Sequence, residues 1–290
     1  MTKTAAGNNQ MRAAIPAFVG IAVALLLYAT FHWWGFFVLF PWIGFSISIG
    51  ILIDNRLPSK RKGLGRRIAL LLTLPALLLF VPIANNENLQ LEGIVLLLSI
   101  GFFGKGVVHY AVAKLFGPLI WSRGFCSWGC WTAAILEWLP VNPAGRVPGQ
   151  LKHLRYLSLA LSIGLPLLLI IGFGFDVRHQ YLRKQEMLWM FAGNSLYYLL
   201  AIPLAFWFKD QRAFCKILCP VSLVMKIPTT FSRMRIRPTV TACVQCGICS
   251  KVCPMEVAVM DAIAAGEGVR DTECIYCGTC RNRCPVGAIR

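Results

Sequence analysis

Long apolar runs alternate with short charged loops along the chain, and their lengths predict helices that cross a membrane. A hydrocarbon core of about 30 Å is spanned by roughly 20 helical residues. Apolar runs suited to such spans lie at 68–83, 91–112, 154–173 and 187–208. The run at 13–53 is too long for one span, and its aromatic segment 31–35 suits the membrane–water interface. We therefore expect two helices joined by a tight turn there, and about six spans in all.

Positive charge is concentrated in the loops that would share one side of a six-span protein. Basic residues fall before residue 13 and at 56–67, 123–155 and 209–237, whereas the loop 84–90 has none. The loop after the fifth span departs in part, because it holds Arg178, Arg183 and Lys184. Since Lys and Arg favour the cytoplasmic side, we expect both termini in the cytoplasm and the spans in a bacterial inner membrane. A single tilted or re-entrant unit at 13–53 would instead leave five spans and an external N-terminus.

The composition supports a membrane protein and disfavours one alternative. Hydrophobic residues make up 57% of the chain and charged residues 14%. A formal net charge of +17 would suit nucleic-acid binding, but here the basic residues lie beside apolar spans, where topology explains them. We expect no nucleic-acid partner. The first apolar run is too long for a signal peptide and lacks a clear cleavage site, so we expect it to be retained.

Eight of the twelve cysteines form two copies of one motif, 31 residues apart. Both copies, 243–254 and 274–285, follow C-x₂-C-G-x-C-x₃-C-P. Three cysteines on a tight loop suit three irons of a cubane, and Gly247 and Gly278 permit the backbone angles of such a loop. In two-cluster ferredoxins the fourth cysteine binds the other cluster. The expected [4Fe–4S] ligands are Cys243, Cys246, Cys249 and Cys284 for the first cluster, and Cys253, Cys274, Cys277 and Cys280 for the second.

Disulfides and structural zinc are the competing explanations for these cysteines. Close spacing suits metal ligation better than long cross-links, and a cytoplasmic location keeps thiols reduced. Zinc also binds C-x₂-C pairs, but a four-ligand zinc site gives no role to the third cysteine or to the Cys-Pro ending. We therefore expect a small α+β ferredoxin-like domain at 233–290, attached to an all-α polytopic membrane region.

A second, shorter repeat frames residues 121–232, which follow an N-terminal membrane region at 1–120 with about four spans. The motif R-x-F-C-x₃-C occurs at 123–130 and at 212–219, which suggests two related membrane halves whose ends meet. Cysteines four residues apart share one face of a helix. A third iron or iron–sulfur centre is one interpretation, and reduced thiols packed as small apolar side chains are the other. The residues concerned are Cys126, Cys130, Cys215 and Cys219.

Ionisable residues inside an apolar span are costly and often functional, which makes His109 and Lys105 candidates for a quinone contact. The structural alternative is that Lys105 snorkels to the interface. His32, His179 and Tyr181 are expected at the opposite surface, where they are candidates to assist quinol deprotonation. Of the four histidines only His109 lies in an expected span, which disfavours haem. No P-loop, dinucleotide fingerprint or hydrolytic triad is visible, so no catalytic residue is assigned.

The order of these elements resembles the NapH/NosR group of membrane-bound polyferredoxins. The resemblance rests on paired spans, C-x₃-C, paired spans, C-x₃-C-P and two ferredoxin repeats, and it covers about 123–290. The segments FCSWGC at 125–130 and HLRY at 153–156 add to it. Two features depart from the group. Trp131 follows Cys130 where the group has proline, and 1–119 holds four expected spans where the group has two.

The resemblance implies a quinol dehydrogenase component that passes electrons from the quinone pool to a partner ferredoxin, cytochrome c or reductase subunit. A cluster-bearing module fused to a polytopic anchor fits this relay, because a hydrophobic donor requires the anchor. The second hypothesis is an assembly or maturation factor that reduces a metal or thiol centre of a client respiratory complex. The third is a membrane tether whose clusters only stabilise its fold.

Overall fold

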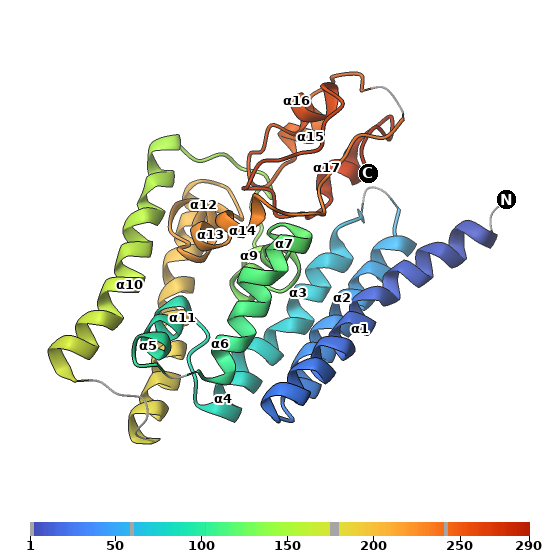
Figure 1. Cartoon of the computed structure of the whole chain (residues 1–290). Coiled ribbons are helices and arrows are strands. Elements are labelled where there is room, and N and C mark those ends of the chain that lie inside the picture. Colours follow the sequence, from blue (N-terminus) through green and yellow to red (C-terminus); the bar gives the residue numbers. More distant parts are fainter. Residues whose placement is uncertain (1–2, 59–60, 102, 175–179, 241–242) are drawn as a thin grey trace.

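The computed structural model describes residues 3–58, 61–101, 103–174, 180–240 and 243–290, with side chains described from residue 11 onward except at 85 and 180–183. Its long helices form a bundle, and a cysteine-rich module lies at one end of that bundle (Figure 1). Arg178 and His179, and the side chains of Tyr181 and Arg183, lie outside the described part.

The first apolar region folds as the predicted hairpin. Helix α1 (Lys3–Phe31) and helix α2 (Phe36–Arg56) run in opposite directions and are joined by a tight turn at residues 32–35. The helices approach closely at Gly20 and Gly44, where an added Cβ would lie 2.4 Å from a backbone oxygen of the opposite helix. Small residues at such positions let apolar helices pack backbone against backbone.

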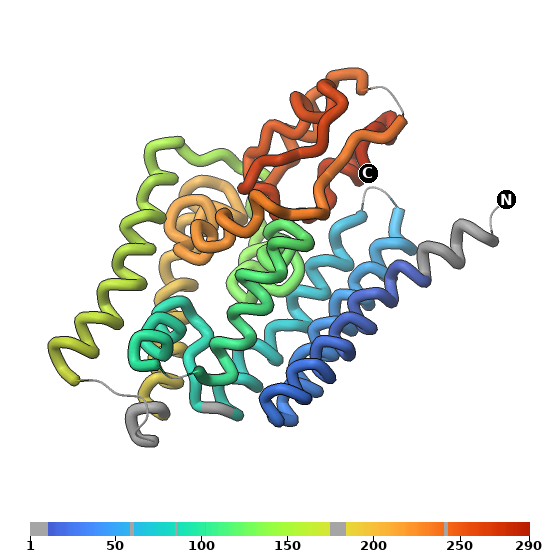
Figure 2. The backbone as a smooth tube through the Cα atoms, in the orientation of Figure 1, coloured from blue at the N-terminus to red at the C-terminus, as the bar shows by residue number. Residues whose placement is uncertain are grey.

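The next span is continuous but changes its helical winding on the way. It comprises α3 (Leu64–Pro75), the π-helical turn η2 (Ala76–Phe80) and α4 (Val81–Asn85). The carboxylate of Asp54 accepts hydrogen bonds from the backbone N–H groups of Gly63 and Gly65, which fixes the turn before α3. Figure 2 traces α2 toward the end that carries the module and α3 away from it.

The expected span at 91–112 is broken into two helices. Helix α5 (Leu91–Ser99) ends before Gly101, which has a left-handed backbone with φ +70°. Helix α6 (Lys105–Tyr110) begins at a new position, where the carboxylate of Glu87 accepts the backbone N–H groups of Lys105 and Gly106. The glycine turn and this cap at the start of α6 interrupt what the apolar pattern alone presents as one helix.

Helix α6 continues without a break toward the module. It passes through the π-helical segment η3 (Ala111–Phe116) into α7 (Gly117–Trp121). The stretch 105–121 is about 25 Å long at roughly 1.5 Å per residue. It begins at the Glu87 loop and ends beside the module, so it runs the length of the bundle (Figure 1).

Five helices in the described residues are long and apolar enough to cross a membrane. The fourth of them consists of the 3₁₀ turn η4 (Gly149–His153) and α10 (Leu154–Phe173), and the fifth lies within α11 (Gln180–Trp207). The five are Met11–Phe31, Phe36–Arg56, Leu64–Ala84, Gly149–Phe173 and Lys184–Trp207. A sixth span is therefore not confirmed, because the stretch that begins at Lys105 is shorter than these helices.

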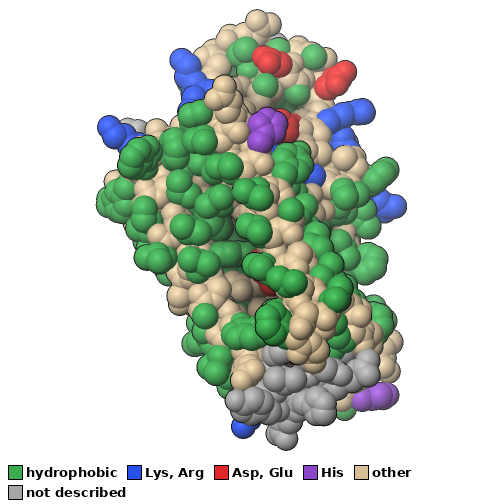
Figure 3. Space-filling model, turned by 90° about the vertical axis from the view of Figure 1, so that its left-hand side faces the viewer, with side chains coloured by type: hydrophobic (Ala, Val, Ile, Leu, Met, Phe, Trp, Pro, Cys, Tyr) green, Lys and Arg blue, Asp and Glu red, His purple; other side chains and the backbone are tan. Residues whose placement is uncertain are grey.

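Apolar side chains cover the outside of the bundle. On the face in Figure 3, hydrophobic side chains fill the middle, and most of the Lys and Arg side chains lie nearer the upper end. Ile171 and Trp207 are each 83% exposed. A continuous apolar exterior of this kind is unsuited to water and suited to lipid.

Short helices form a layer between the long helices and the module. After α7 come α8 (Gly124–Trp128) and α9 (Trp131–Leu136), and after α11 come α12 (Ala213–Ile217), α13 (Val221–Val224) and α14 (Lys226–Thr229). We call this layer the membrane edge. It carries both copies of the R-x-F-C-x₃-C motif.

The C-terminal module contains three short helices, α15 (Ile248–Lys251), α16 (Val259–Ala264) and α17 (Thr279–Arg283). Backbone hydrogen bonds pair 237–239 with 288–290, and one antiparallel bridge joins Pro238 and Ile289. This pairing is too short to make a strand, and no strand occurs in the described residues. The expected α+β character of the module is therefore not confirmed.

Candidate iron–sulfur site

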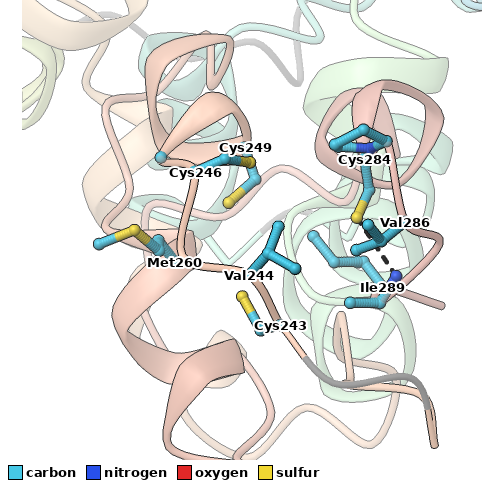
Figure 4. Close-up of a pocket in the computed structure, with 11 residues that line it drawn as sticks. Cys243, Val244, Cys246, Cys249, Met260, Cys284, Val286 and Ile289 are labelled. Carbon is cyan, nitrogen blue, oxygen red and sulfur yellow. Dashed lines mark hydrogen bonds between the residues drawn. The ribbon is translucent and has the colours of Figure 1, made fainter.

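Two cavities lie inside the module, and cysteines from both copies of the repeat line each of them. The first, shown in Figure 4, is lined by Cys243, Cys246, Cys249 and Cys284. The second is lined by Cys253, Cys274, Cys277 and Cys280. Each cavity takes three cysteines from one loop and the fourth from the other loop. These are the same two groups of four that the motif spacing assigns to two clusters.

The two loops have the same backbone conformation. Gly247 and Gly278 lie in the left-handed region at φ +73° and +72°, each directly before a short helix. Two residues earlier, Gln245 and Tyr276 have φ +51° and +53°. A side chain at the glycine positions would be strained, so the glycine of the motif is required by the turn that brings three cysteines to one cavity.

The fourth cysteine of each motif receives a backbone hydrogen bond. The N–H of Val257 donates to Cys253 Sγ at 3.4 Å, and the N–H of Ala288 donates to Cys284 Sγ at 3.2 Å. Hydrogen bonds to cysteine sulfur stabilise negative charge on the ligand and raise the reduction potential of a bound cluster. The two halves of the module are thus alike in ligand geometry as well as in sequence.

Each cavity is lined by four cysteines, the number of ligands that a cubane needs, but they are not gathered around a single ion. A tetrahedral zinc site with bonds of about 2.3 Å holds its sulfurs about 3.8 Å apart. Within the part of the chain that the structure describes, no three Cys, His, Asp or Glu side chains are placed to share one metal ion. A [4Fe–4S] cluster spreads its four cysteines over four irons. The cysteine cavities therefore fit this larger group.

Burial keeps some of these thiols protonated unless a cation binds. It raises the pKa of the Cys274 thiol to about 12. Because the thiolate is the ligand, binding of iron at this position must release a proton.

One buried carboxylate joins the module to the membrane edge. Glu273, next to Cys274, lies 2.6 Å from Arg123, 2.7 Å from Arg155 and 2.5 Å from Lys226. Burial alone would raise the pKa of Glu273, but the charge of Arg123 and the hydrogen bonds from Arg155 and Lys226 outweigh it and lower the pKa to about 2. The carboxylate therefore stays ionised at neutral pH and neutralises cations from three separate elements.

A second carboxylate makes a similar connection. Glu256 lies 2.7 Å from Lys152 and 2.8 Å from Lys216, and it accepts the backbone N–H of Val147. Lys216 also pairs with the fully buried Asp210 at 2.7 Å. Buried pairs of this kind are costly to break, because removal of one partner leaves an uncompensated charge.

Hydroxyl groups from the membrane edge hold the second cysteine loop directly. Ser122 Oγ donates to the carbonyl of Cys274 at 3.1 Å, and Ser127 Oγ donates to the carbonyl of Ile275 at 2.7 Å. In the first loop, by contrast, Cys246 is exposed and Val244 is 60% exposed. The second cavity therefore lies toward the bundle and the first toward solvent.

The four cysteines of the membrane edge lie together. Cys126 is at the middle of α8 and Cys130 follows it, while Cys215 and Cys219 hold the equivalent positions around α12. The negative charge of one thiolate acts on the others, and together with burial this raises the pKa of Cys130 to about 11 and that of Cys219 well above its usual value. We call these four residues the edge quartet.

The two copies of the motif contact each other. Arg212 Nη1 donates to the carbonyl of Cys126 at 2.9 Å and lies 3.9 Å from Cys215 Sγ. The guanidinium of Arg212 also shares the carboxylate of Glu137 with Arg66. Arg212 therefore fixes the two cysteine pairs relative to each other.

Cys126 belongs to two apolar cores at once. It packs against the core of the bundle and also against the core of the module. Its thiol lies 3.6 Å from Met225 Sδ. The edge quartet is thus in contact with the module on the side of the second cavity.

The candidates for a quinone contact lie away from the quartet or are enclosed. His109 is 1% exposed, with its ring 5.9 Å from that of Phe40. Lys105 is half-buried at the start of α6, at the end of the bundle opposite the module. His32 is exposed in the hairpin turn. The quinone contact of His109 and Lys105 stays a prediction, and so does a role of His32 in quinol deprotonation.

Four charged residues lie at the site that were not predicted from the sequence. These are Lys114, Glu137, Glu256 and Glu273, each largely or partly buried. Lys114 carries a recognisable signal, because a lysine inside an apolar run is costly. The ion-pair partners of the three glutamates are distant in sequence, so no local pattern reveals them.

Comparison with known proteins supports this reading of the module. Residues 242–289 match the 4Fe-4S dicluster domain family. The chain carries a 4Fe–4S dicluster domain at its C-terminal end. This domain accounts for the eight cysteines of the two cavities and leaves the edge quartet outside the match.

Two curated proteins are similar over part of the chain. An uncharacterized protein of Methanocaldococcus jannaschii is 32% identical over 80 residues, which is 27% of this chain and 32% of the relative. The "putative electron transport protein YccM" of Escherichia coli K12 is 26% identical over 164 residues, which is 51% of this chain and 46% of the relative. The chain thus spans less than half the length of either relative. No solved structure matches it.

Proposed function

We propose that the protein relays electrons between the quinone pool of a membrane and a partner oxidoreductase. The observation that carries this proposal is the position of the module. Its second cysteine loop is hydrogen-bonded to the membrane edge, and Cys126 packs against its core. A module that exchanged electrons only between soluble partners would not need this contact with the membrane edge. The printed name of the E. coli relative, which refers to electron transport, points the same way. In the NapH/NosR-type interpretation, the protein is a quinol dehydrogenase component.

Within the module we assign one [4Fe–4S] cluster to each cavity. Such a cluster supplies reversible one-electron transfer when bound. The cysteines hold it, Gly247 and Gly278 shape the loops around it, and the N–H groups of Val257 and Ala288 stabilise negative charge on its ligands. A partner ferredoxin, cytochrome c or reductase subunit would approach the solvent side of the first cavity.

We assign a third iron or iron–sulfur centre to the edge quartet. The support is electrostatic. Arg123 and Arg212 are each 1% exposed, and the thiol groups of the quartet are among the charges that act on both guanidinium groups. Glu273 and Glu137 already pair with these two arginines, and an anionic centre held by the quartet would add further negative charge beside them.

The stretch 105–121 provides the sixth crossing in this proposal. It links the Glu87 loop to Ser122 beside the module, and its length of about 25 Å approaches the thickness of the hydrocarbon core. Six crossings put both termini and the module on one side. Arg56 and Lys209, at the module end of α2 and α11, suit the cytoplasmic face of a bacterial inner membrane.

Reporter fusions test this orientation. Green fluorescent protein attached after Arg290 should fluoresce, and alkaline phosphatase attached there should be inactive. Fusions within the turn at 32–35 should give the opposite result. Active phosphatase at the C-terminus would contradict the proposed topology.

Reduction by quinol tests the relay itself. Full-length protein in liposomes should lose the visible absorbance of its clusters when a membrane quinol is added. Cys126→Ser should slow this reduction strongly, because Cys126 joins the two cores, whereas Ser195→Ala on the exposed face of α11 should not. Clusters that stay oxidised with quinol, together with normal turnover of a pre-assembled client complex after depletion of the protein, would favour the assembly-factor hypothesis instead.

A further inference from the structure

Lys114 brings a positive charge into the interior beside the edge quartet. Its side chain is 2% exposed. The ammonium group lies over three aromatic rings, 4.3 Å from the centre of Tyr110, 4.8 Å from that of Trp131 and 5.0 Å from that of Phe125. Phe125 directly precedes Cys126 and Trp131 directly follows Cys130, so the rings that contact Lys114 flank the first cysteine pair.

The backbone around Lys114 is specialised. Lys114 lies in the π-helical segment η3, between the α-helical α6 and α7. Such segments are rare and are frequent at functional sites. Here the segment directs the side chain of Lys114 into the interior, toward the first copy of the R-x-F-C-x₃-C motif, rather than out to the surface.

Within the described part of the chain, Lys114 forms no ion pair with a carboxylate, unlike the two buried arginines of the cysteine motifs. Arg123 pairs with Glu273, and Arg212 pairs with Glu137. In the described residues no ion pair is formed by Lys114. The groups whose negative charge would stabilise the ammonium are three thiols of the quartet and the carboxylate of Glu92. The effect of Glu92 is smaller than those of Cys130, Cys126 and Cys219.

The energetics require an anion near this lysine. An uncompensated ion inside a protein costs several kcal/mol. A cation–π interaction with one aromatic ring offsets only about 0.5–2 kcal/mol of this cost. With neutral thiols in the quartet only the carboxylate of Glu92 offsets the remaining cost, whereas an anionic centre held by the same cysteines would add a second source of negative charge.

We propose that Lys114 is the counter-charge of an anionic redox centre held by the edge quartet, and that it raises the reduction potential of that centre. This inference rests on the third centre proposed above. Oxidation of one quinol to quinone releases two protons to water and two electrons, which the centre accepts one at a time and passes on to the module, while Lys114 neither gains nor loses a bond or a proton. A nearby positive charge stabilises the more negative, reduced state. Lys114 is therefore a positioning and tuning residue rather than a ligand.

Potentiometric titration of the full-length protein, followed by electron paramagnetic resonance, tests the proposal. Lys114→Met removes the charge and should lower the midpoint potential of the third centre, while the two module clusters keep theirs. Lys114→Arg keeps the charge and should stay near the wild-type value. Lys62→Met removes one charge from an exposed loop and should change nothing, because solvent screens it. Lys114→Gln serves as a second neutral variant if Lys114→Met does not accumulate.

Iron analysis separates the two ways in which the proposal fails. More than eight irons per chain with an unchanged third potential in the neutral variants would overturn the role of Lys114 and leave the third centre standing. About eight irons per chain in the wild type, the content of two cubanes, would overturn both. Loss of the extra iron in Lys114→Met, with recovery in Lys114→Arg, would support charge compensation.

Discussion

At the residue scale, the two cysteine loops repeat each other in backbone conformation and in hydrogen bonding to sulfur. Residues 31 positions apart have left-handed φ values that agree within a few degrees. Differences between the two cavities must therefore come from their surroundings. Cys246 faces solvent, whereas the loop of Cys274 is covered by the membrane edge. A cluster in the exposed cavity would be more strongly influenced by water and by any partner that docks there.

Substitution of the loop glycines should disturb the clusters without unfolding the bundle. Gly247→Ala or Gly278→Ala puts a Cβ on a left-handed residue, at a cost of roughly 1–2 kcal/mol. We expect loss of iron from the module on purification, measured by iron and sulfide analysis. Gly164→Ala is the matched control, because Gly164 lies within α10 and nothing surrounds an added Cβ there. Equal iron content in all three variants would contradict the role of the glycines.

Acid should weaken the bundle through Glu137. Burial alone would raise the pKa of this carboxyl, but the charges of Arg66 and Arg212 lower it to about 2, against 4.5 in the unfolded chain. A lowered pKa contributes stability that is fully present above pH 4.5 and is lost as the pH falls toward 2. The contribution is about 3 kcal/mol, so the thermal midpoint in detergent should fall across this window.

Glu137→Gln should reduce that pH dependence and lower stability at neutral pH by about 3–5 kcal/mol, because two buried arginines then lack their anion. Glu267→Gln, at an exposed carboxylate of the module, is the control and should behave as the wild type. Thermal scans at several pH values distinguish the two variants. An unchanged acid transition in Glu137→Gln would assign the effect to other groups.

At the scale of elements, glycines decide how closely the N-terminal helices pack. Gly44→Ala would place a Cβ 2.4 Å from the backbone oxygen of Pro16, which neither helix can move away from cheaply. We expect α1 and α2 to separate locally, with a lower thermal midpoint in detergent. Gly172→Ala, which meets only the end of one leucine side chain, is the control. A midpoint as high as that of the control would show that the hairpin tolerates the separation.

The sequence predicts the long helices well because each is an apolar run of suitable length bounded by charge. It fails at 91–112, where the run is apolar throughout and the break depends on Gly101 and on the cap by Glu87. The cysteine grouping in the module is readable because ligand spacing is local. The roles of Glu256 and Glu273 in holding the module cannot be predicted from the sequence. Their ion-pair partners lie more than 30 residues away along the chain and meet them only in the folded protein.

At the scale of the whole molecule, the module and the bundle are joined as one unit. Glu273→Gln would leave Arg123 and its neighbours without their shared anion, and we expect the module to loosen from the membrane edge. Hydrogen exchange should then speed up in the loop that contains Ile275, whose carbonyl is held by Ser127. Glu267→Gln provides the control at an exposed site. Unchanged exchange in Glu273→Gln would mean that Glu256 and the hydroxyl groups of Ser122 and Ser127 hold the module without Glu273.

The burial of these anchoring ion pairs determines how the protein should behave during cell fractionation. Peripheral proteins are washed from membranes by concentrated salt, because salt screens exposed charges. Glu273 is 19% and Glu256 11% exposed, and the most deeply buried partner of each, Arg123 and Lys216, is 1% and 2% exposed. Screening reaches such pairs poorly. A module severed from the bundle between Pro238 and Cys243 should therefore still sediment with the membranes in high salt.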